Sequence, residues 1–241
     1  MRFKRTFLTF AIILQQVFIS IAQIDGDIED FNFSENRKTY FFSKTSIVLP
    51  LFTNLPSNVN YLTHRNIGYE TALLFCRNKY SSPFNISWGF AYSINNYHSN
   101  VHTWIFEPDV QSSEYVPQIY PDGFDYKKNK MLWSYLRLPA EMNFRFGKKE
   151  WEKFGFDIGA YLSLLLSASN VFVVDFVKTK TIYKDQINPI AYGIHTAFTY
   201  KKVSIFSNLN FNSFFRSENA PYIQLVNFGL SYSIFPPQFL F

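Results

Sequence analysis

The chain has 241 residues, which suits one domain, with 23 basic and 18 acidic residues and a formal net charge of +5. Its single cysteine, Cys76, excludes an intrachain disulfide. Aromatic residues make up 20% of the chain, a high share for a soluble protein, yet the mean hydropathy of −0.08 is close to zero.

The first 22 residues have the pattern of a secretory signal peptide. Three basic residues precede an apolar stretch over 6–19, and Ser20 and Ala22 stand at positions −3 and −1 of a cleavage site before Gln23. The alternative is an N-terminal membrane anchor, but the apolar stretch is short for a spanning helix. Cleavage would remove three basic residues, leaving 20 basic and 18 acidic ones. The mature chain is then nearly neutral, and its charge does not indicate nucleic-acid binding.

After a short periplasmic segment over 23–37, residues 38–241 are predicted to form an all-β domain. Hydrophobic periodicity predicts eight strands, over 38–50, 66–78, 84–96, 131–146, 152–167, 188–201, 203–214 and 222–235. No run of 18 apolar residues follows the signal peptide, so the sequence predicts no spanning helix.

The strands alternate between a bulky apolar row and a row of small or polar residues. In the stretch 134–147, for example, Leu136, Leu138 and Met142 alternate with Arg137 and Glu141. A soluble barrel would place the large apolar residues inside and charges outside. The second row here is rich in Gly, Ala, Ser and Asn and has few charges. This composition favours an eight-stranded antiparallel up-and-down transmembrane barrel, with small polar residues in the lumen and apolar residues facing lipid.

The connections between the predicted strands alternate in length. Short connections at 80–83, 147–151 and 201–202 alternate with longer ones at 51–65, 97–130, 168–187 and 215–221. Outer-membrane barrels have short periplasmic turns and longer extracellular loops. Tryptophan and tyrosine residues near strand ends fit an interfacial aromatic girdle, namely Trp88, Tyr92, Trp133, Trp151, Tyr192, Tyr200 and Tyr232.

Four segments resemble a known family in their order along the chain: "ISWGFAYS", "YLRLPAEMNFRFG", "FGFDIGAYLSLLLSA" and "VNFGLSYSIF". They are similar to strands of the PorT-like outer-membrane β-barrel proteins of Bacteroidota, and the "IAQ" cleavage region suits the same bacteria. The tail "PPQFLF" departs from the family pattern. The resemblance implies an eight-stranded outer-membrane barrel and, for one branch of the family, a role in type IX secretion.

Charged residues on the predicted inward rows form the first candidate site: Glu70, Arg137, Glu141, Arg145 and Asp157. Buried charges must be paired, so one interpretation is a salt-bridge network that fills the lumen and fixes the strand register. The alternative is a selectivity ring for ions. An eight-stranded barrel leaves little open bore, which favours the network.

Other chemistry has little support in the sequence. His98 and His102 lie near Glu107 and Asp109, but without a recognised metal-ligand spacing. His195 is expected to be a hydrogen-bonded interior residue, and no G-x-S-x-G nucleophile motif is present. We therefore predict no catalytic residue, cofactor or metal.

The predicted loop over 97–130 is long enough to carry function. Its aromatic residues Trp104, Tyr115 and Tyr120 could bind a protein partner or a glycan, or the loop could fold over the barrel mouth. The sequence thus predicts a non-enzymatic outer-membrane barrel that serves as a structural or secretion-associated envelope component. Its predicted partners are membrane lipids and other envelope or secretion proteins, and not nucleic acid. The alternatives are a small channel or adhesin of the same fold, and a soluble exported lipid-binding barrel.

Overall fold

The computed structural model describes residues 37–56, 59–61, 65–79, 84–108, 115–119, 126–146, 154–216 and 221–234. The predicted signal peptide and most of the predicted periplasmic segment lie outside these residues. The secondary-structure elements are β1 (Arg37–Thr53), β2 (Gly68–Lys79), β3 (Phe84–His98), β4 (Val101–Pro108), β5 (Tyr115–Ile119), β6 (Lys128–Phe146), β7 (Phe154–Val174), β8 (Val177–Ile182), the short 3-10 helix η3 (Lys184–Gln186), β9 (Ile190–Tyr200), β10 (Val203–Asn210) and β11 (Gln224–Ile234).

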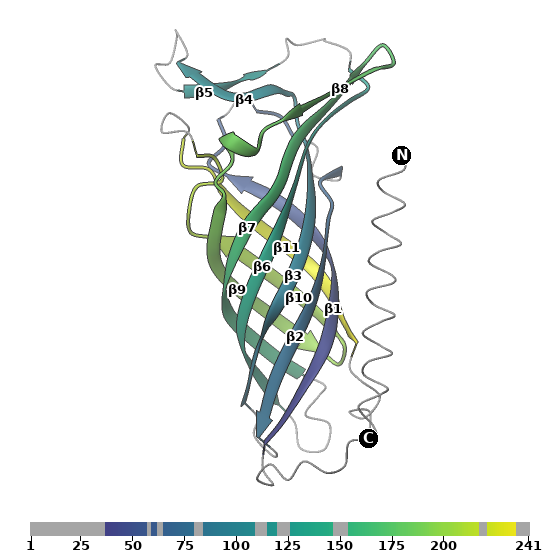
Figure 1. Cartoon of the computed structure of the whole chain (residues 1–241), viewed down its shortest axis with the longest axis vertical. Helices are drawn as coiled ribbons and strands as arrows, with labels where there is room; N and C mark the ends of the chain where they lie inside the picture. Colours follow the sequence, from purple (N-terminus) through teal and green to yellow (C-terminus); the bar gives the residue numbers. More distant parts are fainter. Residues whose placement is uncertain are drawn as a thin grey trace.

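Eight strands close into one antiparallel barrel (Figure 1). The order is β6-β3-β2-β1-β11-β10-β9-β7, and β6 also pairs with β7, which completes the ring. These eight strands correspond to the eight predicted ones, so the predicted fold class is confirmed. Closure satisfies the backbone hydrogen bonds of every barrel strand without leaving an open edge.

Strand β7 and the loops beyond it differ from the prediction. Strand β7 continues to Val174 and turns through Asp175 and Phe176 into β8, so the predicted loop over 168–187 is largely a hairpin. Both turn residues have positive φ, 44° and 67°, as a two-residue type I′ turn requires. Within 97–130, β4 and β5 form a separate two-stranded sheet. Local strand pairing therefore occupies parts of the two longest predicted connections.

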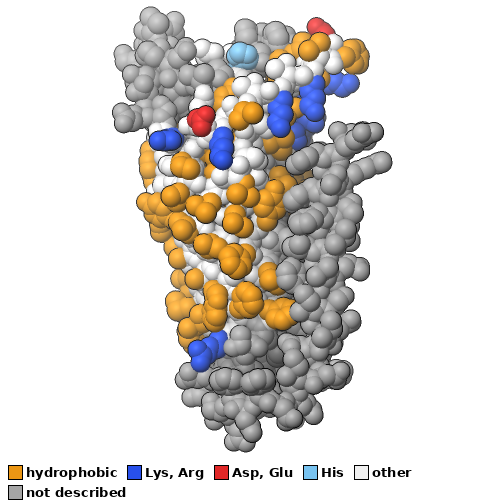
Figure 2. Space-filling model, viewed as in Figure 1, with side chains coloured by type: hydrophobic (Ala, Val, Ile, Leu, Met, Phe, Trp, Pro, Cys, Tyr) orange, Lys and Arg blue, Asp and Glu red, His pale blue; other side chains and the backbone are white. Residues whose placement is uncertain are grey.

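The two rows of each strand face the environments that the alternation predicts. On β3 the buried residues include Asn85, Ser87, Ala91, Ser93 and Asn95, whereas Ile86, Trp88 and Phe90 are exposed. The same alternation holds on β9 and β11. Figure 2 shows exposed apolar side chains as a broad zone on the visible face of the barrel wall. Large exposed apolar side chains and buried small polar ones are the reverse of a soluble barrel.

No helix in the described parts of the chain has the length and hydropathy needed to span a bilayer.

Candidate functional site

The centre of the barrel interior holds an ion pair. Arg137 on β6 and Glu70 on β2 lie 2.7 Å apart, measured from Nη1 to Oε2, with side chains only 7% and 13% exposed. Strand β3 lies between their two strands in the sheet. Both side chains point inward, so the curvature of the barrel brings them together. This pairing offsets the desolvation cost of each charge.

Tyr161 on β7 holds the Arg137 side chain from a second direction. The Arg137 guanidinium lies 4.5 Å from the centre of the Tyr161 ring, a cation–π distance. The Tyr161 hydroxyl donates a hydrogen bond to Asn210 Oδ1 at 2.6 Å. A Cβ atom at Gly193 would lie 2.7 Å from that hydroxyl, so glycine leaves the space that the tyrosine occupies. Arg137 Nε also donates to Ser163 Oγ at 3.3 Å.

Glu141 lies beside a histidine on β9. Its Oε1 atom lies 3.7 Å from His195 Nε2 on β9, and His195 Nδ1 is 2.6 Å from Asn208 Oδ1. The His195 ring also packs 5.7 Å from the Phe206 ring. His195 is thus a buried, hydrogen-bonded interior residue, as the sequence predicts.

Asp157 lies four residues before Tyr161 on β7, in a separate group. Its two carboxylate oxygens accept hydrogen bonds from Asn143 Nδ2 and Thr199 Oγ1, each at 3.1 Å. The side chain of Arg145, the fifth residue of the predicted network, lies outside the described residues. Among the described side chains, Arg137 therefore meets Glu70, Glu141 lies beside His195, and Asp157 accepts from Asn143 and Thr199.

Aromatic and aliphatic side chains fill the barrel at its long-loop end. Phe52, Tyr97, Trp133, Phe214 and Phe215 are all buried there and share one apolar cluster. The Phe52 ring centre lies 4.6 Å from that of Tyr97 and 4.8 Å from that of Phe214. We call this cluster the mouth plug. It closes the lumen on the side opposite the short turns.

The prediction that Trp133 belongs to the outer aromatic girdle is wrong. Trp133 is 1% exposed, and its ring lies 5.1 Å from Phe214 inside the mouth plug. Trp133 has the same parity along β6 as Tyr135 and Arg137, so the alternation itself points it inward. Other predicted girdle residues, Trp88, Tyr192, Tyr200 and Tyr232, are 43–50% exposed on the outer face. Trp151 lies outside the described residues.

A cavity of about 20 Å³ lies between the central ion pair and its neighbours, lined in part by Lys44, Glu70, Arg137, Glu141 and His195. That volume suffices for roughly one water molecule. The sequence analysis missed Lys44, which is 7% exposed on the inner face of β1. Lys44 has the same parity along the strand as Ser46 and Val48, and this pattern could have identified it as an inward residue.

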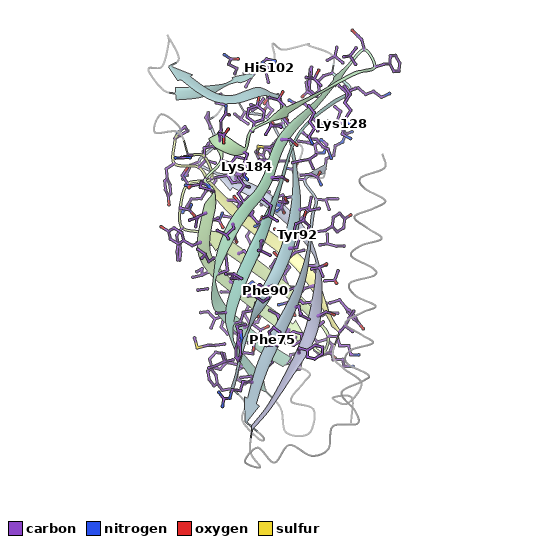
Figure 3. The ribbon with its side chains drawn as sticks, in the orientation of Figure 1. Phe75, Phe90, Tyr92, His102, Lys128 and Lys184 are labelled. Atoms are coloured by element: carbon purple, nitrogen blue, oxygen red, sulfur yellow. The ribbon has the colours of Figure 1, made fainter. Side chains whose placement is uncertain are left out.

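Figure 3 places His102 with the β4–β5 sheet, beyond the long-loop end of the barrel. His98 ends β3 and His102 lies on β4, whereas Asp109 and the side chain of Glu107 are outside the described residues. In the ranges that the structure describes, no three His, Cys, Asp or Glu side chains cluster as metal ligands. Trp104 lies on β4 and Tyr115 on β5, but their side chains, and all of Tyr120, are not described.

A closed antiparallel barrel with an apolar exterior and a polar interior defines the class of transmembrane β-barrels. The sequence model of the outer membrane protein beta-barrel domain family matches residues 57–218, more than half of the chain. The chain belongs to this family and is an outer-membrane β-barrel protein. No match was found among curated protein sequences.

Two solved structures are similar to this chain over most of its length. Neisserial surface protein A (NspA) has 10% sequence identity and a TM-score of 0.36, with 83% of this chain and 99% of that chain covered. Ail, the attachment invasion locus protein of Yersinia pestis, was solved in complex with the heparin analogue sucrose octasulfate. It has 11% identity and a TM-score of 0.34, with the same coverage of 83% and 99%.

Proposed function

We propose that this protein is a non-conducting, non-enzymatic barrel of the outer membrane, serving as a structural component of the cell envelope. The observation that carries the proposal is the filling of the lumen. The mouth plug closes one end, and the Arg137–Glu70 pair, Tyr161 and His195 occupy the centre. The cavity beside the central ion pair has a volume of about 20 Å³, which is room for roughly one water molecule.

The filled lumen weakens the alternative of a small diffusion channel. Channels need polar walls around a continuous bore. Here Arg137 is paired with Glu70, and Asp157 accepts two hydrogen bonds, which suits a role in stability and strand register. A role in protein secretion is implied by the PorT-like resemblance alone, and no feature of the described residues favours it.

Conductance measurements test this proposal. The refolded full chain should insert into planar bilayers without steady single-channel current. A variant that removes both obstructions, carrying Trp133→Ala, Phe214→Ala, Arg137→Ala and Glu70→Ala, serves as the positive control and should conduct if it folds. Folding of each protein is checked by heat-modifiable migration on gels. Steady current through the wild-type barrel would contradict the proposal.

An adhesin is the second candidate, and the β7–β8 hairpin favours it. This hairpin extends beyond the barrel and exposes Phe176 (91%) and Val177 (67%) at its tip (Figure 1). These two neighbouring apolar side chains give the hairpin tip a surface that a partner could cover. Binding of labelled cells that express the protein to an epithelial monolayer, compared with a Phe176→Ser variant, tests this role. Equal adhesion of both would contradict it.

A further inference from the structure

Strands β6, β7 and β8 continue the barrel wall upward as a three-stranded extension. The strand register aligns Lys128 with Val173, and Val173 with Lys178, in one row. The next row toward the barrel aligns Lys130, Val171 and Lys180. Directly opposite residues lie on the same face of a sheet, so the four lysines share one face. In Figure 3, Lys128 is labelled at this end of the barrel.

This lysine-bearing face continues the lipid-facing side of the wall. On β6 the even-numbered residues Leu136, Leu138 and Met142 face outward, and Lys128 and Lys130 have the same parity. On β7 the outward residues lower on the wall are the even-numbered Leu162 and Leu164. A register shift opposite Ser134 and Tyr135 leaves Leu166 as an extra residue, so that beyond it the odd-numbered Val171 and Val173 continue the same face. Figure 2 shows basic side chains above the apolar zone on this side of the molecule.

The height of the lysine rows fits the headgroup layer of a bilayer. Val171 follows Leu166 by five residues, which places its row about 13 Å above that leucine once a strand tilt of about 40° is included. Lysine side chains can lower their ammonium groups toward the phosphate level while their methylene stems stay against apolar surface. Ile182, on the same face and 76% exposed, supplies such a surface next to Lys180.

Three of the four lysines are available for a ligand. Lys130 Nζ already donates to Asn96 Oδ1 at 2.8 Å. Lys128 is partly exposed, Lys178 and Lys180 are exposed, and none of them forms an ion pair with a residue that the structure describes. The nearest acid along the hairpin is Asp175, in the turn at its tip.

We propose that Lys128, Lys178 and Lys180 form a binding site for the phosphate groups of lipid headgroups in the outer leaflet. Lys178 and Lys180 are about 7 Å apart along β8, and Lys128 is about 10 Å away across β7, so the three ammonium groups can surround one phosphorylated headgroup. Lysine binds phosphate as a strong point charge. This site depends on the position of the barrel in the membrane and not on its closed lumen.

The test measures binding of diphosphoryl lipid A to the folded full chain in nonionic detergent by native mass spectrometry. Removing two cations near a charged lipid surface should weaken binding by about tenfold or more, so we expect this loss in the Lys178→Gln, Lys180→Gln variant. The Lys178→Arg, Lys180→Arg variant should retain binding. Lipid A without its phosphates should bind wild type and the glutamine variant equally weakly.

A face-swap variant is the matched control. It carries Lys178→Thr, Thr179→Lys, Lys180→Thr and Thr181→Lys, which keeps composition and net charge but moves both lysines to the opposite face of β8. All four positions are exposed, so the barrel should fold, as heat-modifiable migration can verify. We expect the same loss of lipid binding as in the glutamine variant.

Three results would overturn the proposal. If the face-swap variant bound diphosphoryl lipid A as tightly as the wild type, only net charge would matter. Saturable, lysine-dependent binding of inorganic phosphate would assign the site to a free anion. Unchanged lipid binding with self-association of the glutamine variant would show that the lysines protect the β8 edge from strand pairing.

Discussion

Arg137 and Glu70 form a 2.7 Å ion pair across the inside of the barrel although strand β3 separates their strands. In a flat sheet, side chains two strands apart stand about 10 Å from each other, a gap that two long side chains must bridge. The curvature of the barrel shortens this gap because inward side chains converge. Its two charges come from sequence positions 67 residues apart, on β2 and β6.

A double-mutant cycle tests the coupling of this pair. Arg137→Ala and Glu70→Ala should each lower the free energy of unfolding by about 3–5 kcal/mol, because each leaves a buried charge without its partner. The double variant should lose less than the sum. Urea unfolding in detergent, followed by tryptophan fluorescence, gives the values. A cycle of Arg137→Ala with Glu141→Ala is the control and should be close to additive, and strictly additive effects in the first cycle would refute the pairing.

The buried position of Trp133 predicts its response to quenchers. In variants that keep one tryptophan and replace the others with phenylalanine, Trp88 should be quenched by lipids with brominated acyl chains. Trp133, which is 1% exposed within the mouth plug, should be quenched neither by these lipids nor by iodide. Quenching of Trp133 by brominated lipid would place it on the outer face.

Gly229 makes room for an interior ring. A Cβ atom at this position would lie 2.5 Å from Phe206 Cζ and would also contact the backbone oxygen of Ile47. Gly229→Ala should therefore destabilise the barrel by about 1–3 kcal/mol, the usual cost of overpacking. Adding Phe206→Leu should recover part of the loss. Chemical unfolding with a gel-shift readout measures both.

Ser231→Ala is the control for Gly229→Ala. Ser231 is also buried on the inner face of β11, and its hydroxyl forms no hydrogen bond with any described residue. Its replacement should change the stability little. If Gly229→Ala were equally neutral, the close packing around Phe206 would be wrong.

Cysteine labelling tests the orientation of the barrel in the cell. In a Cys76→Ser background, Thr179→Cys on the β7–β8 hairpin should react with a membrane-impermeant maleimide on intact cells. Lys201→Cys, in the two-residue connection between β9 and β10, should react only after the cells are opened. The native Cys76, 2% exposed among inward residues, should stay unreactive until the barrel unfolds. Labelling of Lys201→Cys on intact cells would reverse the orientation.

Much of the barrel could be predicted from local pattern. Alternation assigned the faces of β3, β6 and β9, because a strand side chain points to one of two sides and the residue after it to the other. The same rule placed Arg137, Asp157 and His195 inside, where the structure has them. The prediction for Trp133 was wrong because it followed the general preference of tryptophan for the membrane interface. The parity of the strand would have placed Trp133 inside.

The partners of the inward charges could not be predicted in this way. Parity shows that Glu70, Arg137 and Glu141 point into the same space, but not which of them meet. That depends on the register of each strand pair and on closure between β6 and β7, both of which are long-range. Likewise, the lysines of β8 share a face with Lys128 only because β7 continues past its predicted end and aligns the two strands on either side of it.

The sequence alone determined which residues face lipid and which face the lumen, since that choice is local to each strand. Only the closed tertiary structure decided how the inward residues pair and fill the bore, since curvature brings distant strands within contact distance.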